Sequence, residues 1–127
     1  MNYALEHSFI QGCLRIRVTG TWPSQKVEEV ISDMFSLWEL NQKPILIDIR
    51  GMTDTPSVLR DYLSAEQFAK AGFRRVGRVA VLDNPERHDA NDFFETTAHN
   101  RGLTFRFFYA GEQEAIEWLI SDKEGYA

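Results

Sequence analysis

The apolar residues of this 127-residue chain recur with two periods, about two in short segments and about 3.6 in longer ones. Residues 13–19 (CLRIRVT) alternate between apolar side chains and side chains of other kinds, which predicts a half-buried strand. Residues 3–9 are a weaker strand candidate. Gln11 and Gly12, between the two, are typical of a hairpin turn, so we expect these strands to be antiparallel neighbours.

Three further segments read as strands, and the first two are apolar on both faces, as central strands of a parallel sheet are. They are residues 45–49, 76–82 and 104–109. Helical spacing predicts four helices, which are residues 23–41, opened by Pro23 and Ser24, residues 57–71, a helix through residues 93–98 that stops at Gly102, and residues 112–121.

Two helix boundaries stay open in the sequence. Ser64 begins a capping-box pattern, which allows a break or restart inside the second helix. Asp83 and Asp89 are both candidate caps in the loop before the third helix.

The resulting order of elements is β-β-α-β-α-β-α-β-α. It predicts one α/β domain over residues 1–127, with a mixed, mostly parallel five-stranded sheet and about four helices.

Composition narrows the function classes. The chain is 43% hydrophobic, as globular proteins are. Its net charge of −5 argues against the electrostatic binding of backbone phosphates on which nucleic-acid binders depend. A basic group at Lys70, Arg74, Arg75 and Arg78 is interpreted as a solvated helix end. The N-terminus does not resemble a signal peptide, and no apolar run reaches the ~18 residues of a membrane span.

The only cysteine, Cys13, has no partner for a disulfide within the chain, which indicates a reducing compartment. We therefore expect a soluble cytoplasmic protein. Cys13 lies among apolar neighbours and is interpreted as a small buried hydrophobe.

The sequence predicts no catalytic residues, no metal site and no cofactor. Gly-rich phosphate loops, nucleophile elbows and zinc-protease motifs are absent. His7, His88 and His99 are assigned to three separate elements without metal-ligand spacing. A hydrolase or transferase built on His88, His99 and an acidic partner is the least favoured hypothesis.

The best candidate site is the bend that follows the apolar strand at residues 45–49. Ligands of open α/β sheets bind at the carboxyl ends of the strands, and free N–H groups at a helix start can hold an anion. Ser57 is the expected N-cap, and a purely structural bend is the alternative. The candidate binding residues are Asp48, Arg50, Gly51, Thr53, Asp54, Thr55, Ser57 and Arg60.

Several motifs resemble a known family. Asp48-Ile-Arg-Gly-Met-Thr53 resembles the strand-end motif of anti-sigma-factor antagonist (STAS) domains. The segment FFETTAHNRG at residues 93–102, with RFF at 106–108 and AIEWL at 115–119, resembles the C-terminal half of SpoIIAA-like proteins. Residues 18–21 (VTGT) fit the same group. The resemblance runs from about residue 3 to residue 121 and implies a STAS/Sec14-like fold in a cytoplasmic bacterial protein.

The resemblance also implies a function, as a switch without catalytic machinery. In STAS domains, a kinase phosphorylates a serine in a bend that usually reads Asp-Ser-Ser-Gly-Leu. Here the bend reads DTPSVL at residues 54–59, is shorter and lacks that glycine, so Thr55 and Ser57 are the candidate phosphorylation sites.

Two functions follow from these observations. The favoured one is a non-enzymatic regulatory or protein-interaction module that contacts an unknown protein partner through residues 50–60. The alternative, implied by the Sec14-like side of the resemblance, is a carrier or sensor of a small apolar ligand or lipid in a closed cavity. The apolar first strand also makes a homodimer plausible.

Overall fold

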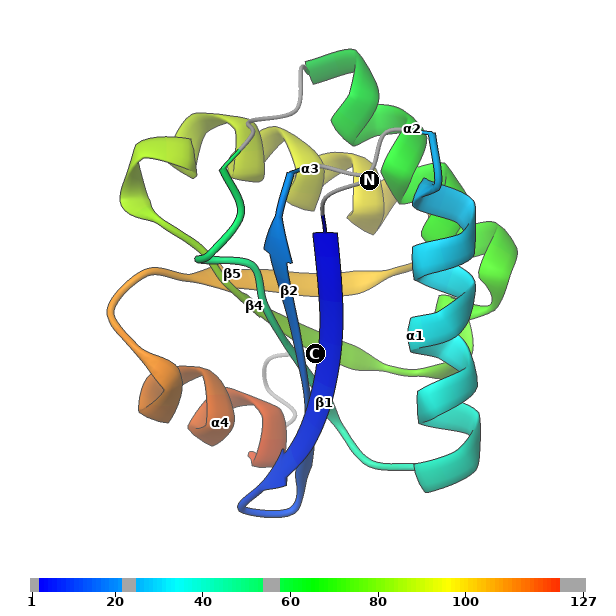
Figure 1. Cartoon of the computed structure of the whole chain (residues 1–127). Coiled ribbons are helices and arrows are strands. Elements are labelled where there is room, and N and C mark those ends of the chain that lie inside the picture. Colours follow the sequence, from blue (N-terminus) through cyan, green and yellow to red (C-terminus); the bar gives the residue numbers. More distant parts are fainter. Residues whose placement is uncertain (1–2, 22–24, 54–57, 122–127) are drawn as a thin grey trace.

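The structure, a computed structural model, describes residues 3–21, 25–53 and 58–121, and the side chains of these residues except 58–63 (Figure 1). The order of elements is the predicted one. The five strands are β1 (Tyr3–Ile10), β2 (Cys13–Gly20), β3 (Ile45–Asp48), β4 (Arg78–Leu82) and β5 (Thr104–Phe108). They form one sheet in sequence order, in which β1 is antiparallel to β2 and the other neighbours are parallel. The predicted mixed, mostly parallel sheet is confirmed.

The helices are α1 (Val27–Asn41), α2 (Val58–Ala71), α3 (His88–Asn100) and α4 (Glu112–Ile120), with short 3-10 turns η1 (Phe73–Arg75) and η2 (Pro85–Arg87). The first three connect neighbouring parallel strands. Because such crossovers share one hand, they bring α1, α2 and α3 to the same face of the sheet. The helix α4 is the last element of the described residues and packs on the opposite face (Figure 1).

This arrangement divides the core into two layers. Ile45 and Ile47 of β3 face the layer under α1, α2 and α3, whereas Leu46 faces the layer under α4. All three side chains are buried, which confirms that β3 is covered on both faces. Cys13 lies fully buried in the α4 layer as a free thiol, as predicted. The helix α4 packs mainly on β3, β4 and β5 and covers only the turn end of the β1–β2 hairpin, so this face is more open from Arg15 toward Arg17.

Several boundaries differ from the prediction. The second helix runs without a break through Ser64, whose side chain is buried. The fourth strand begins at Arg78, because Val76 and Gly77 form the end of the turn that follows η1. Neither Asp83 nor Asp89 caps the third helix, whose N-cap is Arg87. Pro23 and Ser24 lie outside the described residues, and the described first helix begins at Val27.

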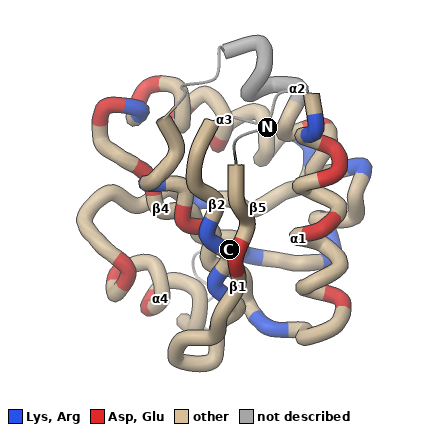
Figure 2. The backbone as a smooth tube through the Cα atoms, in the orientation of Figure 1, with Lys and Arg blue, Asp and Glu red and all other residues tan. Residues whose placement is uncertain are grey.

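Three of the four residues in the predicted basic group, Arg74, Arg75 and Arg78, make structural contacts. Arg74 donates to the carbonyl of Arg101 at 2.7 Å, and the guanidinium of Arg75 lies over the rings of Phe35 and Trp38. Basic and acidic residues are interspersed over the described backbone (Figure 2). No helix in the described ranges is long and apolar enough to cross a membrane.

Candidate functional site

The candidate site lies where β3 and β4 end, because a buried acidic side chain stands at the end of each strand. Asp48 is the last residue of β3 and is 3% exposed, and Asp83 follows β4 and is 1% exposed. The backbone N–H of Ile49 donates to the carbonyl of Leu82 at 3.0 Å, which ties the two strand ends together. The chain then forms a turn, in which the backbone N–H of Met52 donates to the carbonyl of Ile49 at 3.1 Å.

Asp48 organises the start of this turn. One carboxylate oxygen accepts hydrogen bonds from the backbone N–H and the Nε of Arg50, both at 3.0 Å, and the other accepts from Arg50 Nη2 at 3.0 Å. Arg17 of the neighbouring β2 approaches the same carboxylate at 3.5 Å. Burial by itself raises the pKa of Asp48, but the hydrogen bonds from Arg50 and the charges of both arginines outweigh it and lower the pKa below its usual value.

Gly51 lets the turn approach the end of β2. A Cβ at this position would lie 2.8 Å from Cγ2 of Thr19, so only glycine fits without a shift. The backbone N–H of Thr53 donates to the carbonyl of Gly20 at 2.8 Å, and Met52 forms an isolated parallel bridge with Gly20. Residues 50–53 are therefore held against the end of β2.

A second set of residues, whose role the sequence pattern does not predict, holds the same turn from the end of β4. Arg87 donates to Asp83 Oδ1 at 2.6 Å and to the carbonyl of Met52 at 2.6 Å, and its side chain is 8% exposed. It also reaches the carbonyl of Ile49 at 3.5 Å. One buried guanidinium thus connects the end of β4 to the turn after β3.

Asp83 is the centre of this set rather than a helix cap. It accepts hydrogen bonds from the side-chain amide of Asn91 at 2.9 Å and from the backbone N–H of Asn84 at 2.7 Å. Asn91 also reaches the hydroxyl of Tyr109 at 3.4 Å. Burial raises the pKa of Asp83 above its usual value, and the bonds from Asn91, Asn84 and Arg87 oppose that rise without cancelling it.

Four of the eight predicted site residues meet at this edge of the sheet. They are Asp48, Arg50, Gly51 and Thr53. Asp54, Thr55 and Ser57 lie outside the described residues, as does the side chain of Arg60 on α2. The capping role predicted for Ser57 and both phosphorylation candidates therefore stay predictions.

The histidines are placed differently from the prediction. His88 and His99 lie on one element, at opposite ends of α3, and not on two separate elements. They are eleven positions apart along the helix, a rise of roughly 16 Å, which is too far for a shared reaction. Nδ1 of His88 lies 3.4 Å from Asp92 and 3.7 Å from Asp89, and all three side chains are exposed at the helix start. Acidic groups are favourable there without any ion.

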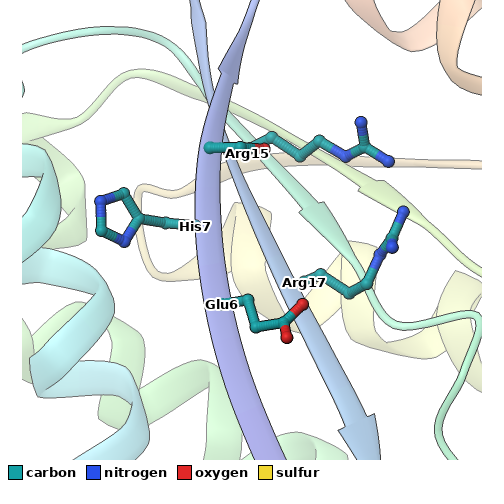
Figure 3. Close-up of a pocket in the computed structure, with 5 residues that line it drawn as sticks. Glu6, His7, Arg15 and Arg17 are labelled. Carbon is teal, nitrogen blue, oxygen red and sulfur yellow. The ribbon is translucent and has the colours of Figure 1, made fainter.

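The open part of the α4 face carries a shallow depression of about 180 Å³ lined by Glu6, His7, Ser8, Arg15 and Arg17. Arg15, Arg17 and Glu6 extend to one side of the β1–β2 hairpin, while His7 points to the other (Figure 3). Arg15 also pairs with Glu112 of α4 at 3.1 Å. The depression is polar and exposed, and it does not have the features of a closed apolar ligand cavity.

The sequence matches no family model, and no curated protein matches it. Among solved structures, the chain is similar to an uncharacterised protein of the DUF3478 family with a SpoIIAA-like fold from Shewanella loihica PV-4. The two share 18% sequence identity and a TM-score of 0.55 over 93% of this chain and 94% of that chain. The protein therefore has a SpoIIAA-like fold, as the resemblance of its motifs predicted.

Proposed function

We propose that this protein is a non-enzymatic protein-interaction module of the STAS-like type, formed by residues 1–127 as one domain, which contacts its partner through residues 50–60. The free, buried Cys13 and the composition support a cytoplasmic setting. The regulatory part of the proposal is that Thr55 or Ser57 carries a phosphate that changes the contact.

The observation that carries this proposal is the anchoring of the turn by Arg87. Burying an ion pair costs several kcal/mol of desolvation per ion, and a chain of this size could fill the same space with apolar side chains. Here the buried guanidinium of Arg87 is used to fix the carbonyl of Met52, at the edge where open α/β sheets bind their ligands. Rigid support below a loop is what a preorganised contact surface needs.

A carrier function has weaker support, because the aromatic side chains that could line a cavity contact one another. The ring of Phe68 lies 4.8 Å from that of Phe73 and 4.9 Å from that of Phe105, and Phe94 lies 5.4 Å from Phe105. These are the distances of packed aromatic pairs. The rings fill the layer under α2 and α3, which favours a packed interior.

An enzymatic function has no support from the histidines. The hydrolase hypothesis needs two of the proposed groups within hydrogen-bond reach across a cleft. His88 meets its acidic neighbours on the exposed surface of a single helix, and His99 is at the far end of that helix.

The proposal is tested by capturing partners from the native cell extract with the wild-type protein and with a Thr55→Ala/Ser57→Ala variant. We expect one specific protein to be recovered at least about fivefold less with the variant. Removing a helix cap costs about 1 kcal/mol, so the variant should remain folded. The matched control is Ser32→Ala/Ser36→Ala, which removes two exposed hydroxyl groups from α1.

Equal recovery of every protein by all three forms contradicts the proposed contact surface. Intact mass, measured on protein from its native cells, tests the regulatory part. A phosphate-sized increment that survives denaturation and maps to Thr55 or Ser57 supports the switch. An increment seen only under native conditions supports the carrier of a small molecule instead.

A further inference from the structure

The strand β1 forms an edge of the sheet that lacks the usual protection. It is eight residues long, contains no proline or lysine, and pairs only with β2 among the described residues. Edge strands of natural proteins are commonly short, covered, or interrupted by such residues, since an open edge is a template for another strand. Phe9, on this strand, is a large apolar side chain that is 52% exposed.

The hairpin turn determines which backbone groups are available at this edge. Gln11 and Gly12 have φ angles of 49° and 84°, as in a type I′ turn, and they connect the facing residues Ile10 and Cys13. The turn hydrogen bond directs the carbonyl of Ile10 toward β2. Because hydrogen-bonded and non-hydrogen-bonded positions alternate, the backbone N–H and C=O of Leu5, His7 and Phe9 point away from β2.

We propose that β1 binds β1 of a second copy of this chain as an antiparallel strand, with His7 opposite the partner's His7. A two-fold axis perpendicular to the sheet passes between the two histidines, and the two sheets join into one. The contact is separate from the surface proposed above for the protein partner and does not depend on it.

The side chains of β1 select this register. Residues directly opposite each other must lie on the same face of the sheet, so one strand can shift relative to the other only by two residues at a time. Each such shift moves the two-fold axis by one residue along β1. With His7 on the axis, Leu5 lies opposite the partner's Phe9 and Ala4 lies opposite the partner's Ile10. Every residue from 4 to 10 is then paired, and the exposed Phe9 gains an apolar neighbour.

The neighbouring registers are less favourable than the one with His7 on the axis. The next one toward the N-terminus places Glu6 opposite the partner's Glu6, and like charges in that position are destabilising. The next one toward the C-terminus places Ile10 opposite the partner's Glu6 and leaves Ala4 unpaired. A register with the axis at Leu5 leaves Phe9 without an opposite residue in the partner's β1, and therefore exposed.

Charge complementarity supports the same pairing on the α4 face. Glu6 faces Arg17 across the hairpin, and Ser8 faces Arg15. When the strands pair with His7 on the axis, Glu6 lies opposite the partner's Ser8. The row across the joined sheet then reads arginine, glutamate, serine, arginine, so each carboxylate lies between an arginine of its own chain and a hydroxyl donor. The depression in Figure 3 lies beside this contact.

The first test is Ser8→Glu, measured by size-exclusion chromatography with light scattering. Within one chain the new carboxylate faces Arg15, so the folded monomer tolerates it. Across the proposed interface it faces the partner's Glu6, and this happens twice because of the symmetry. We expect wild-type protein at twice 14.7 kDa and dimerisation of the variant weakened by at least about tenfold. At protein concentrations low enough for both forms to be monomeric, their melting temperatures should agree.

The control Ser32→Glu introduces the same charge on the exposed face of α1 and should leave the dimer intact. A double variant, Glu6→Gln/Ser8→Glu, removes the like-charge contact and should recover the dimer. Wild-type protein that stays monomeric at about 0.5 mM overturns the proposal. A wild-type dimer unaffected by Ser8→Glu also overturns it, because the contact must then lie elsewhere.

A cysteine scan tests the register. Cys13 is fully buried, so a single introduced cysteine is the reactive thiol. A residue that faces its own copy forms a disulfide-linked dimer under mild oxidation, since paired Cα atoms lie about 5.5 Å apart. We expect His7→Cys to crosslink much faster than Glu6→Cys or Leu5→Cys. Faster crosslinking at position 6 or 5 assigns another register and refutes the one proposed.

Discussion

The buried ion pair between Asp83 and Arg87 gives the sharpest prediction, because one substitution removes the cation and leaves the anion in place. Arg87→Met keeps a long, unbranched side chain and removes the guanidinium. The hydrogen bonds to Asp83 Oδ1 and to the carbonyl of Met52, both 2.6 Å long, are lost. Asp83 keeps its bonds from the amide of Asn91 and the backbone of Asn84.

The expected loss of stability follows from burial. Removing one partner of a buried ion pair costs about 3–5 kcal/mol, and the two remaining hydrogen bonds to Asp83 place this case near the lower end, at about 3 kcal/mol. Asp83 is 1% exposed and Arg87 is 8% exposed, so water screens the pair little. The turn at Met52 also loses its anchor, and residues 50–53 should exchange their amide hydrogens faster.

The loss should depend on pH in a defined direction. Burial raises the pKa of Asp83 even beside Arg87, and removing the guanidinium raises it further. When a carboxyl has a higher pKa in the folded state than in the unfolded state, the free energy of unfolding falls as pH rises through the interval between the two pKa values. The destabilisation by Arg87→Met is therefore largest at pH 7 and shrinks as pH falls toward the ordinary aspartate range near 4.

Urea denaturation followed by tryptophan fluorescence measures both effects at pH 7 and pH 5. Arg74→Met is the matched control, because Arg74 is exposed and donates only to a surface carbonyl among the contacts described for it. Its cost should stay below about 1 kcal/mol at both pH values. Equal losses for the two variants, or a loss by Arg87→Met that does not change with pH, would refute the reasoning.

Three further predictions concern the strand end and the core. Gly51→Ala should destabilise the fold by about 1–3 kcal/mol because its Cβ meets Thr19, and adding Thr19→Ser should restore much of this in urea titrations. Asp48→Asn should cost stability at pH 7, and that cost should shrink below pH 4, because the lowered pKa of Asp48 stabilises the fold only while the carboxyl is ionised; a cost that grows on acidification would contradict this. Phe68→Ala should lower the free energy of unfolding by about 3–5 kcal/mol and Phe93→Ala by far less, since Phe68 contacts three other phenylalanine rings and Phe93 is 38% exposed; thermal melts compare the two.

Part of the candidate site could be predicted from the sequence. Asp48, at the end of an apolar strand and two residues before Arg50, has the spacing of a local turn, and the structure contains that turn. The sequence does not predict the role of Arg87, because the polar segment at residues 83–92 has the composition of a loop. One signal is present in the sequence, since Asp83, Arg87 and Asn91 recur every four residues, a spacing that brings side chains together in helical structure.

The sequence by itself determined the order and type of the elements. Apolar periodicity is a local signal, and the segment at residues 45–49 has side chains suited to burial on both faces wherever it lies. Only the tertiary structure decided which distant groups meet. Arg87 reaches Met52 across 35 positions, and Arg17 reaches Asp48, because β2, β3 and β4 lie side by side in one register. Such contacts depend on strand order and register, which a local pattern of side chains does not encode.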